Sequence, residues 1–488
     1  MITLRAGQCV CLAAAAAAFV AGLVLYPGNR FVFAGFSVVM FGLLGGALRT
    51  PRQYAHLFLA LAWFTGFWFK YLYHLVTGAP YYELSGSFDN SPAAWDAVFT
   101  VIATGFSGYV AGRLVWSAAA GRLQIAAEAR TMWCPSWWPA RRNLMWLAAG
   151  ALVLLVVLAN QEFGLLTRGY VAKLILPWPL GGLFAWMTDI GLALLLAIFL
   201  VWDRLSGCGV ARGFAALAAE GALFSVSTLS RGIYFFHTIP ALVTEGGAAL
   251  RASRRRQLAL LLIIWIAAGV AVPSATTFLR LFGSQSLPTT DAQLANSRSV
   301  ERRTETELSA GVLLSQFEVM ARLLLIDRWT GLEGTMATVA YPAKSMGLFA
   351  EAALKRRSYG TVDVYTRRIS GASFSEENAK IYHFATLAGP IAFLYFSGSL
   401  LLAFVGMAFL ALLVSGFECA WRWLVGDRLL VAVSGLYLAL VVLQLSGSVV
   451  QAVTGPLAVT AVFVLLRSLG SLVARSGPAP SSPTQVLS

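Results

Sequence analysis

Charge is scarce in this chain of 488 residues. Asp, Glu, Lys and Arg make up only 12% of it, hydrophobic residues make up 58%, and the mean hydropathy is +0.72. A soluble globular protein carries about twice that share of charge, so the composition excludes that class. Repeated apolar runs separated by short polar turns predict an all-α polytopic membrane protein, because a bilayer accepts backbone only in closed hydrogen-bonded structures such as helices.

The net charge of +14 comes almost entirely from arginine, since only five of the 36 basic residues are lysine. In a soluble protein this excess would suggest a nucleic-acid partner. In a membrane protein it belongs to the cytoplasmic loops. We therefore expect the lipid bilayer as a partner and no nucleic acid.

Cysteine and histidine are rare as well, with five and four residues. None of the cysteines lies in the longest polar segment of the chain, so no disulfide is expected there. The cysteines and histidines form no cluster with the spacing of a zinc site. We therefore expect no metal and no cofactor.

The apolar runs and the arginines between them predict about twelve transmembrane helices, with both ends of the chain in the cytoplasm. Residues 1–273 hold the first nine helices, and 274–385 form one large periplasmic loop that contains short helices. Residues 386–475 hold the last three helices, and 476–488 form a disordered cytoplasmic tail. The arginine cluster at 251–256 fixes the cytoplasmic side, and a helix one bilayer core long leads back from it to the periplasmic surface.

The loop 274–385 holds 13 of the 36 Lys and Arg residues and 11 of the 22 Asp and Glu residues. Its apolar periodicity predicts short helices at 302–325 and 343–355. Ser375, followed by two glutamates, predicts the start of a third helix that carries His383 toward the membrane. Charge concentrated in one external segment indicates a loop that holds an anionic substrate.

Arg231 is the most informative single position. It lies in the turn between two apolar helices, beside the hydroxyls of Thr228 and Ser230 and before Gly232, which would let a ligand approach closely. The planar guanidinium group suits two-pronged phosphate binding. An arginine at a membrane interface is as often a simple anchor, and the sequence leaves both interpretations open.

Other candidates are histidines and loop arginines. His383 is predicted in the periplasm close to the membrane, where a general base would be needed. His237, about two turns below Arg231, is either a buried partner or a relay. Arg322 and Arg328 either bind the substrate or pair with neighbouring carboxylates.

The remaining ionisable residues divide by their surroundings. Glu220 and Glu245 lie within apolar helices and are functional candidates because charge is costly in lipid. Lys70 is predicted to open a periplasmic loop, and His74 to be structural. The pair Arg367–Arg368 is predicted to form ion pairs on a solvated surface.

The order of these features resembles one known family. Ser230-Arg231-Gly232 opens an apolar helix, a basic cytoplasmic turn and one more span follow, and a large periplasmic loop leads to His383 before the last spans. This arrangement, over residues 214–412, resembles the O-antigen polymerase and O-antigen ligase superfamily. The resemblance implies a metal-independent glycosyltransferase of the bacterial inner membrane, which transfers glycan from undecaprenyl pyrophosphate on the periplasmic face.

The resemblance also implies roles for single residues. Arg231 corresponds to the family's essential arginine at this turn, and His383 to its loop-end histidine, as catalytic residues. A second essential arginine lies in the family's loop, and Arg328 or Arg322 would be its counterpart. The chain departs from the commoner His-Asn pattern, since Phe384 follows His383.

The expected function is therefore polymerisation of lipid-linked oligosaccharide repeat units into O-antigen or exopolysaccharide. A chain-length regulator and a flippase are candidate protein partners. An O-antigen ligase is an alternative, since nothing in the sequence identifies the acceptor. A flippase is a second alternative, and a dolichyl-phosphate type of glycosyltransferase is disfavoured because the first predicted external turn has no acidic residue.

Overall fold

The computed structural model describes residues 2–128, 132–251, 255–285, 322, 326–327, 329, 331–355, 362–372 and 388–476. Helix is the only extended regular structure in these ranges, which confirms the all-α class. The helices of the first half are α1 (Ile2–Leu25), α2 (Arg30–Arg49), α3 (Tyr54–Trp63), η1 (Phe64–Phe69), α4 (Lys70–Thr77), α5 (Pro92–Glu128), α6 (Trp138–Phe163), α7 (Leu180–Trp186), η2 (Met187–Gly191), α8 (Leu192–Leu205) and α9 (Ala211–Ser227). Those of the second half are α10 (Ile233–Arg251), α11 (Arg255–Gln285), α14 (Leu332–Ala340), α15 (Met346–Leu354), η4 (Tyr365–Ile369), α17 (Pro390–Tyr395), α18 (Leu400–Val425), α19 (Arg428–Leu443) and α20 (Val449–Ser476).

Among the described residues, seven helices are long and apolar enough to cross a membrane. They are α2, α5, α6, the continuous α7–η2–α8, α11, α18 and α20. Residues 13–25 of α1 and helix α19 form shorter apolar helices. A helix lies at each of the twelve predicted spans, but the number of crossings and their direction stay predictions.

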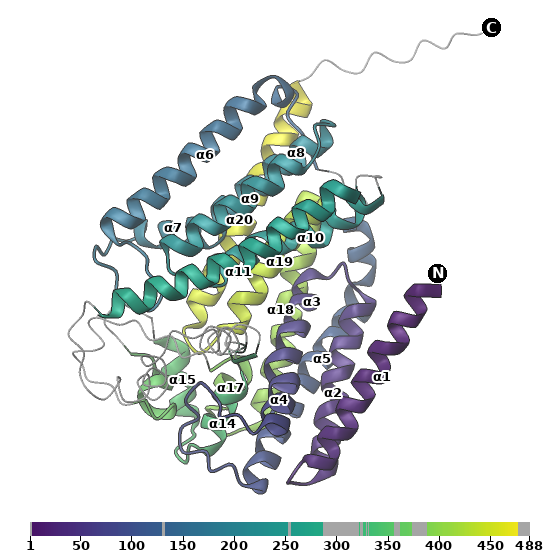
Figure 1. Cartoon of the computed structure of the whole chain (residues 1–488), viewed down its shortest axis with the longest axis vertical. Helices are drawn as coiled ribbons and strands as arrows, with labels where there is room; N and C mark the ends of the chain where they lie inside the picture. The colour runs from purple at the N-terminus through teal and green to yellow at the C-terminus, as the bar shows by residue number, and fades with distance from the viewer. Residues whose placement is uncertain are drawn as a thin grey trace, which may run out of the picture.

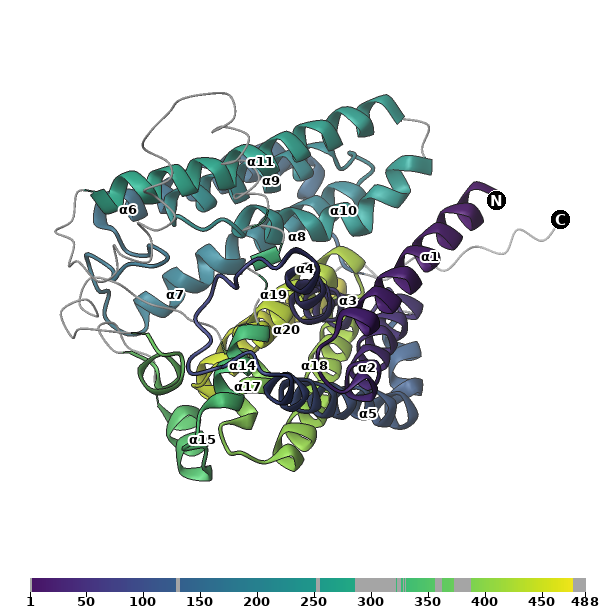
Figure 2. The ribbon, with the colours of Figure 1, turned by 60° about the horizontal axis from the view of Figure 1, so that its bottom comes forward.

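The helices form an elongated bundle, with short helices gathered at one end (Figure 1). Helix α1 begins and helix α20 ends at the upper ends of these helices in Figure 1, whereas α14, α15 and α17 lie at the lower left. In Figure 2 this lower end comes forward, and α14 and α17 lie beside each other there. We call segment 78–91 and the described residues of 322–372, which include α14, α15 and η4, the cap.

Helices α5 and α18 have the most extensive contact among the described helices, and glycines allow their backbones to approach. A Cβ atom on Gly108 would lie 2.1 Å from the carbonyl oxygen of Phe404, and one on Gly112 would lie 2.2 Å from that of Ala408. Membrane helices lack a hydrophobic drive to associate, so close backbone approach and dispersion hold them together.

Two predicted loop boundaries are wrong. Lys70 does not open a loop, because α3, η1 and α4 form one continuous helix that ends only at Gly78, and the Lys70 side chain is fully buried. The loop predicted from residue 274 begins inside α11, which passes through Pro273 and reaches Gln285. Within this helix, the Oγ1 hydroxyls of Thr276 and Thr277 both donate to the carbonyl oxygen of Pro273.

The cap differs in part from its prediction. The short helix predicted at 343–355 is present as α15, and the Ser345 hydroxyl caps it by accepting a hydrogen bond from the Leu348 N–H. Helix α14 was not predicted. It packs against α5 and α17, and Gly334 allows this, since a Cβ atom there would lie 2.3 Å from the carbonyl oxygen of Ala388. The helix predicted after Ser375, and all of 302–325 except residue 322, lie outside the described residues.

Candidate functional site

Two other segments of the chain form hydrogen bonds with the turn that carries Arg231. Asn160 of α6 donates through Nδ2 to the carbonyl oxygen and the Oγ atom of Ser227, at 3.0 and 2.9 Å. The backbone N–H of Arg168 donates to the carbonyl oxygen of Thr228 at 2.8 Å. Leu229 takes a left-handed conformation with φ of 53°, which is strained for a non-glycine residue. The turn is therefore a fixed platform for Arg231, which is half-buried.

Gly232 has a different role from the one that the sequence suggested. A Cβ atom on Gly232 would lie 2.7 Å from the ring of Phe236, one turn further along α10. The glycine thus makes room for an aromatic ring of its own helix. Close approach of a ligand is not needed to explain it.

A series of polar contacts connects the helices on either side of this turn to η2. His237 of α10 is buried and forms an ion pair through Nδ1 with Oε2 of Glu220 in α9, at 2.7 Å. Its Nε2 atom lies 3.1 Å from the carbonyl oxygen of Asp189 in the π-helical turn η2. The Asp189 carboxylate in turn pairs with the guanidinium of Arg168. We call Arg168, Asp189, Glu220, Arg231 and His237 the turn cluster.

These contacts give partners that the sequence could not name. His237 is buried, and Glu220 is the residue it pairs with. Gly221 lets α9 and α10 come close enough for this pair, because a Cβ atom there would lie 3.2 Å from the Cα atom of Tyr234. A buried His–Glu pair beside a π-helical turn is the kind of local irregularity that often marks a functional site.

A second group of ionisable residues joins α4 to the cap, and we call it the cap cluster. Lys70 is 0% exposed, and its Nζ atom lies 2.5 Å from Oε1 of the buried Glu333 in α14. His74, one turn further along α4, places Nε2 3.2 Å from Oδ1 of Asp327. Arg322 places Nε 3.0 Å from Oδ2 of the same carboxylate.

The two carboxylates of the cap cluster titrate differently. Burial raises the pKa of Glu333, and the Lys70 ammonium only partly offsets this. Burial also acts to raise the pKa of Asp327, but the hydrogen bond from His74 and the positive charges of Arg322 and Lys70 outweigh it, so this pKa lies below its ordinary value. Asp327 is therefore held as a carboxylate.

The sequence-predicted site residues fall in different places. Arg231 and His237 belong to the turn cluster, and Arg322 belongs to the cap cluster, where it also donates through NH2 to the carbonyl oxygen of Pro80 at 2.6 Å. Arg322 thus has the ion pair that was the alternative to substrate binding. His383 and Arg328 lie outside the described residues.

For several ionisable residues, the sequence did not predict a place in a polar cluster or name a partner. Lys70 and His74 are four residues apart, which places them on one face of a helix, and this spacing was a usable signal. Asp189 interrupts an apolar run and was also visible. Glu245 pairs with Arg204, which in turn pairs with Asp427, the N-cap of α19, so a structural role explains it. Arg368 lies 3.1 Å from Glu351 in an exposed ion pair, as predicted.

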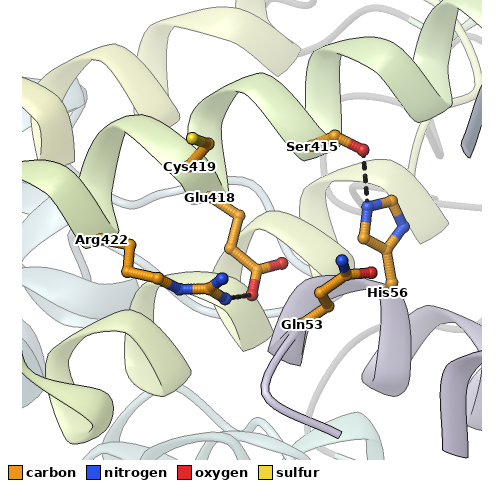
Figure 3. Close-up of a pocket in the computed structure, with 6 residues that line it drawn as sticks. All are labelled: Gln53, His56, Ser415, Glu418, Cys419 and Arg422. Atoms are coloured by element: carbon orange, nitrogen blue, oxygen red, sulfur yellow. Dashed lines mark hydrogen bonds and ion pairs between the residues drawn. The ribbon is translucent and has the colours of Figure 1, made fainter. Parts of the chain in front are cut away.

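Figure 3 shows a small pocket at the start of α3, toward the other end of the bundle, with its polar groups paired. Glu418 of α18 accepts hydrogen bonds from the N–H groups of Tyr54 and Ala55 at 2.6 and 3.2 Å, and from Arg422 at 2.9 Å. His56 lies between Ser415 and the hydroxyl of Tyr109, at 2.8 and 2.7 Å. Glu418 thus caps the first turn of α3, and this cluster joins α3 to α18 as a structural element. Its remaining lining residues are Gln53 and Cys419.

The described parts of the chain contain no group of three or more His, Cys, Asp or Glu side chains placed to hold a metal ion. Comparison of the chain with protein-family models, with curated proteins and with solved structures found no match. The apolar helices and the paired charges between them define the class as a helical membrane protein.

Proposed function

We propose that the chain is an inner-membrane glycosyltransferase that polymerises undecaprenyl-pyrophosphate-linked oligosaccharide repeat units on the periplasmic face. The observation that supports this most is Arg231 on a turn braced by Asn160 and by the backbone of Arg168, between the two helices that carry the buried His237–Glu220 pair. A rigid arginine can compensate developing phosphate charge without reorganising during the reaction.

The reaction requires few groups. A hydroxyl of the acceptor glycan attacks the anomeric carbon of the donor, the bond from that carbon to the pyrophosphate oxygen breaks, and the pyrophosphate leaves with the electron pair. Arg231 stabilises the charge on the leaving pyrophosphate, and the hydroxyl proton passes to a base. The family resemblance assigns the base to His383 and a second phosphate contact to Arg328.

Arg322 and His237 take other roles in this proposal. Because Arg322 already pairs with Asp327, Arg328 is the better candidate for the loop arginine. Because Nδ1 of His237 pairs with Glu220 and its Nε2 faces the carbonyl of Asp189, the histidine supports the turn and does not bind substrate directly. An O-antigen ligase would use the same groups with lipid A–core as acceptor and remains the nearest alternative.

A transporter of lipid-linked oligosaccharide is the second candidate, and one observation favours it. The sequence suggests few charges inside the bundle, which disfavours a transporter. The structure places the buried Glu220–His237 pair inside the bundle, and buried ionisable groups of this kind mark ion or substrate pathways in transporters.

Transfer assays with purified protein in liposomes separate these functions. We expect glycan transfer from a lipid-linked donor to survive EDTA. We also expect Arg231→Lys to be nearly as damaging as Arg231→Ala, since lysine lacks the two-pronged geometry. One charge-assisted hydrogen bond is worth about 1.5–3 kcal/mol, which is about ten- to a hundred-fold in rate.

The matched control is Arg368→Lys, because Arg368 forms only an exposed ion pair and should tolerate lysine. Full activity of Arg231→Lys would make Arg231 an interface anchor. Movement of the donor lipid across the bilayer without formation of a glycosidic bond would establish the transporter instead.

A further inference from the structure

Lys70 directs its ammonium group at three oxygen atoms of the cap. The ammonium group has three protons and no acceptor. It donates to the carbonyl oxygens of Asp327 at 2.7 Å and of Trp329 at 3.2 Å, and it lies 2.5 Å from Oε1 of Glu333. Figure 2 shows α4, which carries Lys70, ending next to the cap.

The charges of the cap cluster compensate one another. Lys70 is matched by Glu333, and Arg322 is matched by Asp327, to which His74 also turns its Nε2 atom. A cluster with balanced and mutually paired charges has no excess positive charge for an anionic substrate. Its contacts instead join a helix of the bundle to a distant segment of the chain.

We propose that Lys70 is a positioning residue that clamps the backbone at residues 327 and 329 against α4. Its two carbonyl acceptors belong to residues 327 and 329, so the clamp acts on the backbone directly. On the proposed function, residue 328 is the loop arginine that contacts the pyrophosphate, and this part of the proposal rests on that function. The clamp itself does not.

A simpler role for Lys70 would be to neutralise Glu333. An unpaired charge left in a buried site costs several kcal/mol, so Lys70→Met alone could weaken folding for that reason. The double variant Lys70→Met/Glu333→Met removes both charges and leaves none unpaired. It should fold, yet it lacks the donor for the two carbonyls. The two roles therefore predict different reaction rates for a cysteine placed at position 329 in the double variant.

The experiment measures how fast a cysteine at position 329 reacts with a maleimide. The background is the full chain in liposomes with the five native cysteines replaced by serine, carrying Trp329→Cys, which is half-buried. We expect slow labelling with Lys70 present and labelling faster by at least about tenfold in the double variant, from loss of hydrogen bonds to a charged donor. A wild-type labelling rate in the double variant would overturn the proposal, because Lys70 would then only neutralise Glu333.

Lys344→Met is the matched control. Lys344 is a half-buried lysine in the cap region that also donates to two carbonyls, those of Val339 and Tyr341, but both lie at the end of its neighbouring helix α14. Its replacement should leave labelling at position 329 unchanged. Faster labelling in this variant as well would show general loosening of the cap and would also overturn the proposal.

A transfer assay on the same variants tests the link to function. We expect the double variant to lose kcat by at least tenfold with its thermal stability near wild type, because the loop arginine is no longer held in place. If the labelling pattern appears as expected while the wild-type protein transfers no glycan, the clamp stands and the glycosyltransferase proposal fails. If the wild-type protein transfers glycan and labelling at position 329 does not change in the double variant, the glycosyltransferase proposal stands and the clamp fails.

Discussion

In the described part of the chain, buried ionisable residues pair between helices. Lys70 meets Glu333 in a distant segment, and Glu220 meets His237 in the next helix. Removing one member of such a pair leaves the other buried without compensation, which costs about 3–5 kcal/mol. These residues therefore fix which helices can be neighbours, whatever the protein transfers or transports.

Asp327 gives a prediction about pH. Its pKa in the folded protein lies below the ordinary value of 3.8, so its ionised form stabilises the fold at all pH values above that. The contribution is lost only as the pH falls through the lowered pKa. We expect Asp327→Asn to unfold at a lower temperature than wild type, with a constant difference from pH 7 to pH 5 that shrinks only below about pH 4.

The measurement is thermal unfolding followed by tryptophan fluorescence, with both proteins in the same detergent. Glu351→Gln is a suitable control, because Glu351 is exposed and its ion pair with Arg368 lies at the surface. If the difference in unfolding temperature between Asp327→Asn and wild type disappears between pH 7 and pH 6, the paired carboxylate is not the source of that difference.

At the scale of elements, the contact of α5 with α18 depends on two glycines that face backbone. Gly112 has no room for a Cβ atom beside Ala408, whereas Gly42 of α2 has no atom within 4 Å of where its Cβ would be. We expect Gly112→Leu to separate the two helices and to destabilise the protein by at least about 1–3 kcal/mol. Gly42→Leu should be neutral.

Thermal unfolding of the purified variants checks this comparison. Both substitutions place the same side chain in a membrane-embedded helix, so intrinsic helix propensity and hydrophobicity change equally. Equal melting temperatures for the two variants would mean that α5 and α18 can move apart at little cost, against the close approach described here.

The positions of the helices could be predicted from the sequence, because each apolar run is long enough to form one. The boundaries near Lys70 and residue 274 could not, because a lysine and a proline were taken to end helices. Lys70 continues its helix since Glu333 and two carbonyls compensate its charge, and these partners are about 260 residues away in the sequence. Helix α14 was missed because it is short and depends on contacts with α5 and α17.

The candidate site could be predicted only in part, because some of its contacts depend on how the helices pack. Arg231 was found because it interrupts two apolar helices at a turn, which is a local signal. The partner of Glu220 depends on how α9 packs against α10 around Gly221, and no local pattern gives that packing. The roles of His383 and Arg328 stay predictions.

At the scale of the molecule, the arrangement of the bundle leads to a test of orientation. The cap lies at the end of the bundle away from the start of α1 and the end of α20 (Figure 1). If the termini are cytoplasmic, as the charges of the turns predict, then the exposed Ser345 of the cap is periplasmic. We expect Ser345→Cys to react with an impermeant thiol reagent in intact cells.

The native Cys134 and Cys208 provide the internal control for this test, because both are predicted to be cytoplasmic. They should stay unlabelled until the membrane is opened. Labelling of Cys208 in intact cells, together with no labelling at position 345, would reverse the orientation and move the proposed chemistry to the other side of the membrane.

The π-helical turn η1 affects the direction in which the side chains of α4 point around the helix axis. A π-helical turn closes its hydrogen bond over one residue more than an α-helical turn, and η1 directly precedes Lys70. If the same residues formed an ordinary α-helix, the additional residue would advance the chain by one α-helical step and rotate everything after it by about 100° about the helix axis. Lys70 and His74 would keep their identity and their spacing but would face away from the cap. A single inserted residue, chemically inert itself, thus sets the direction in which the charged side chains point.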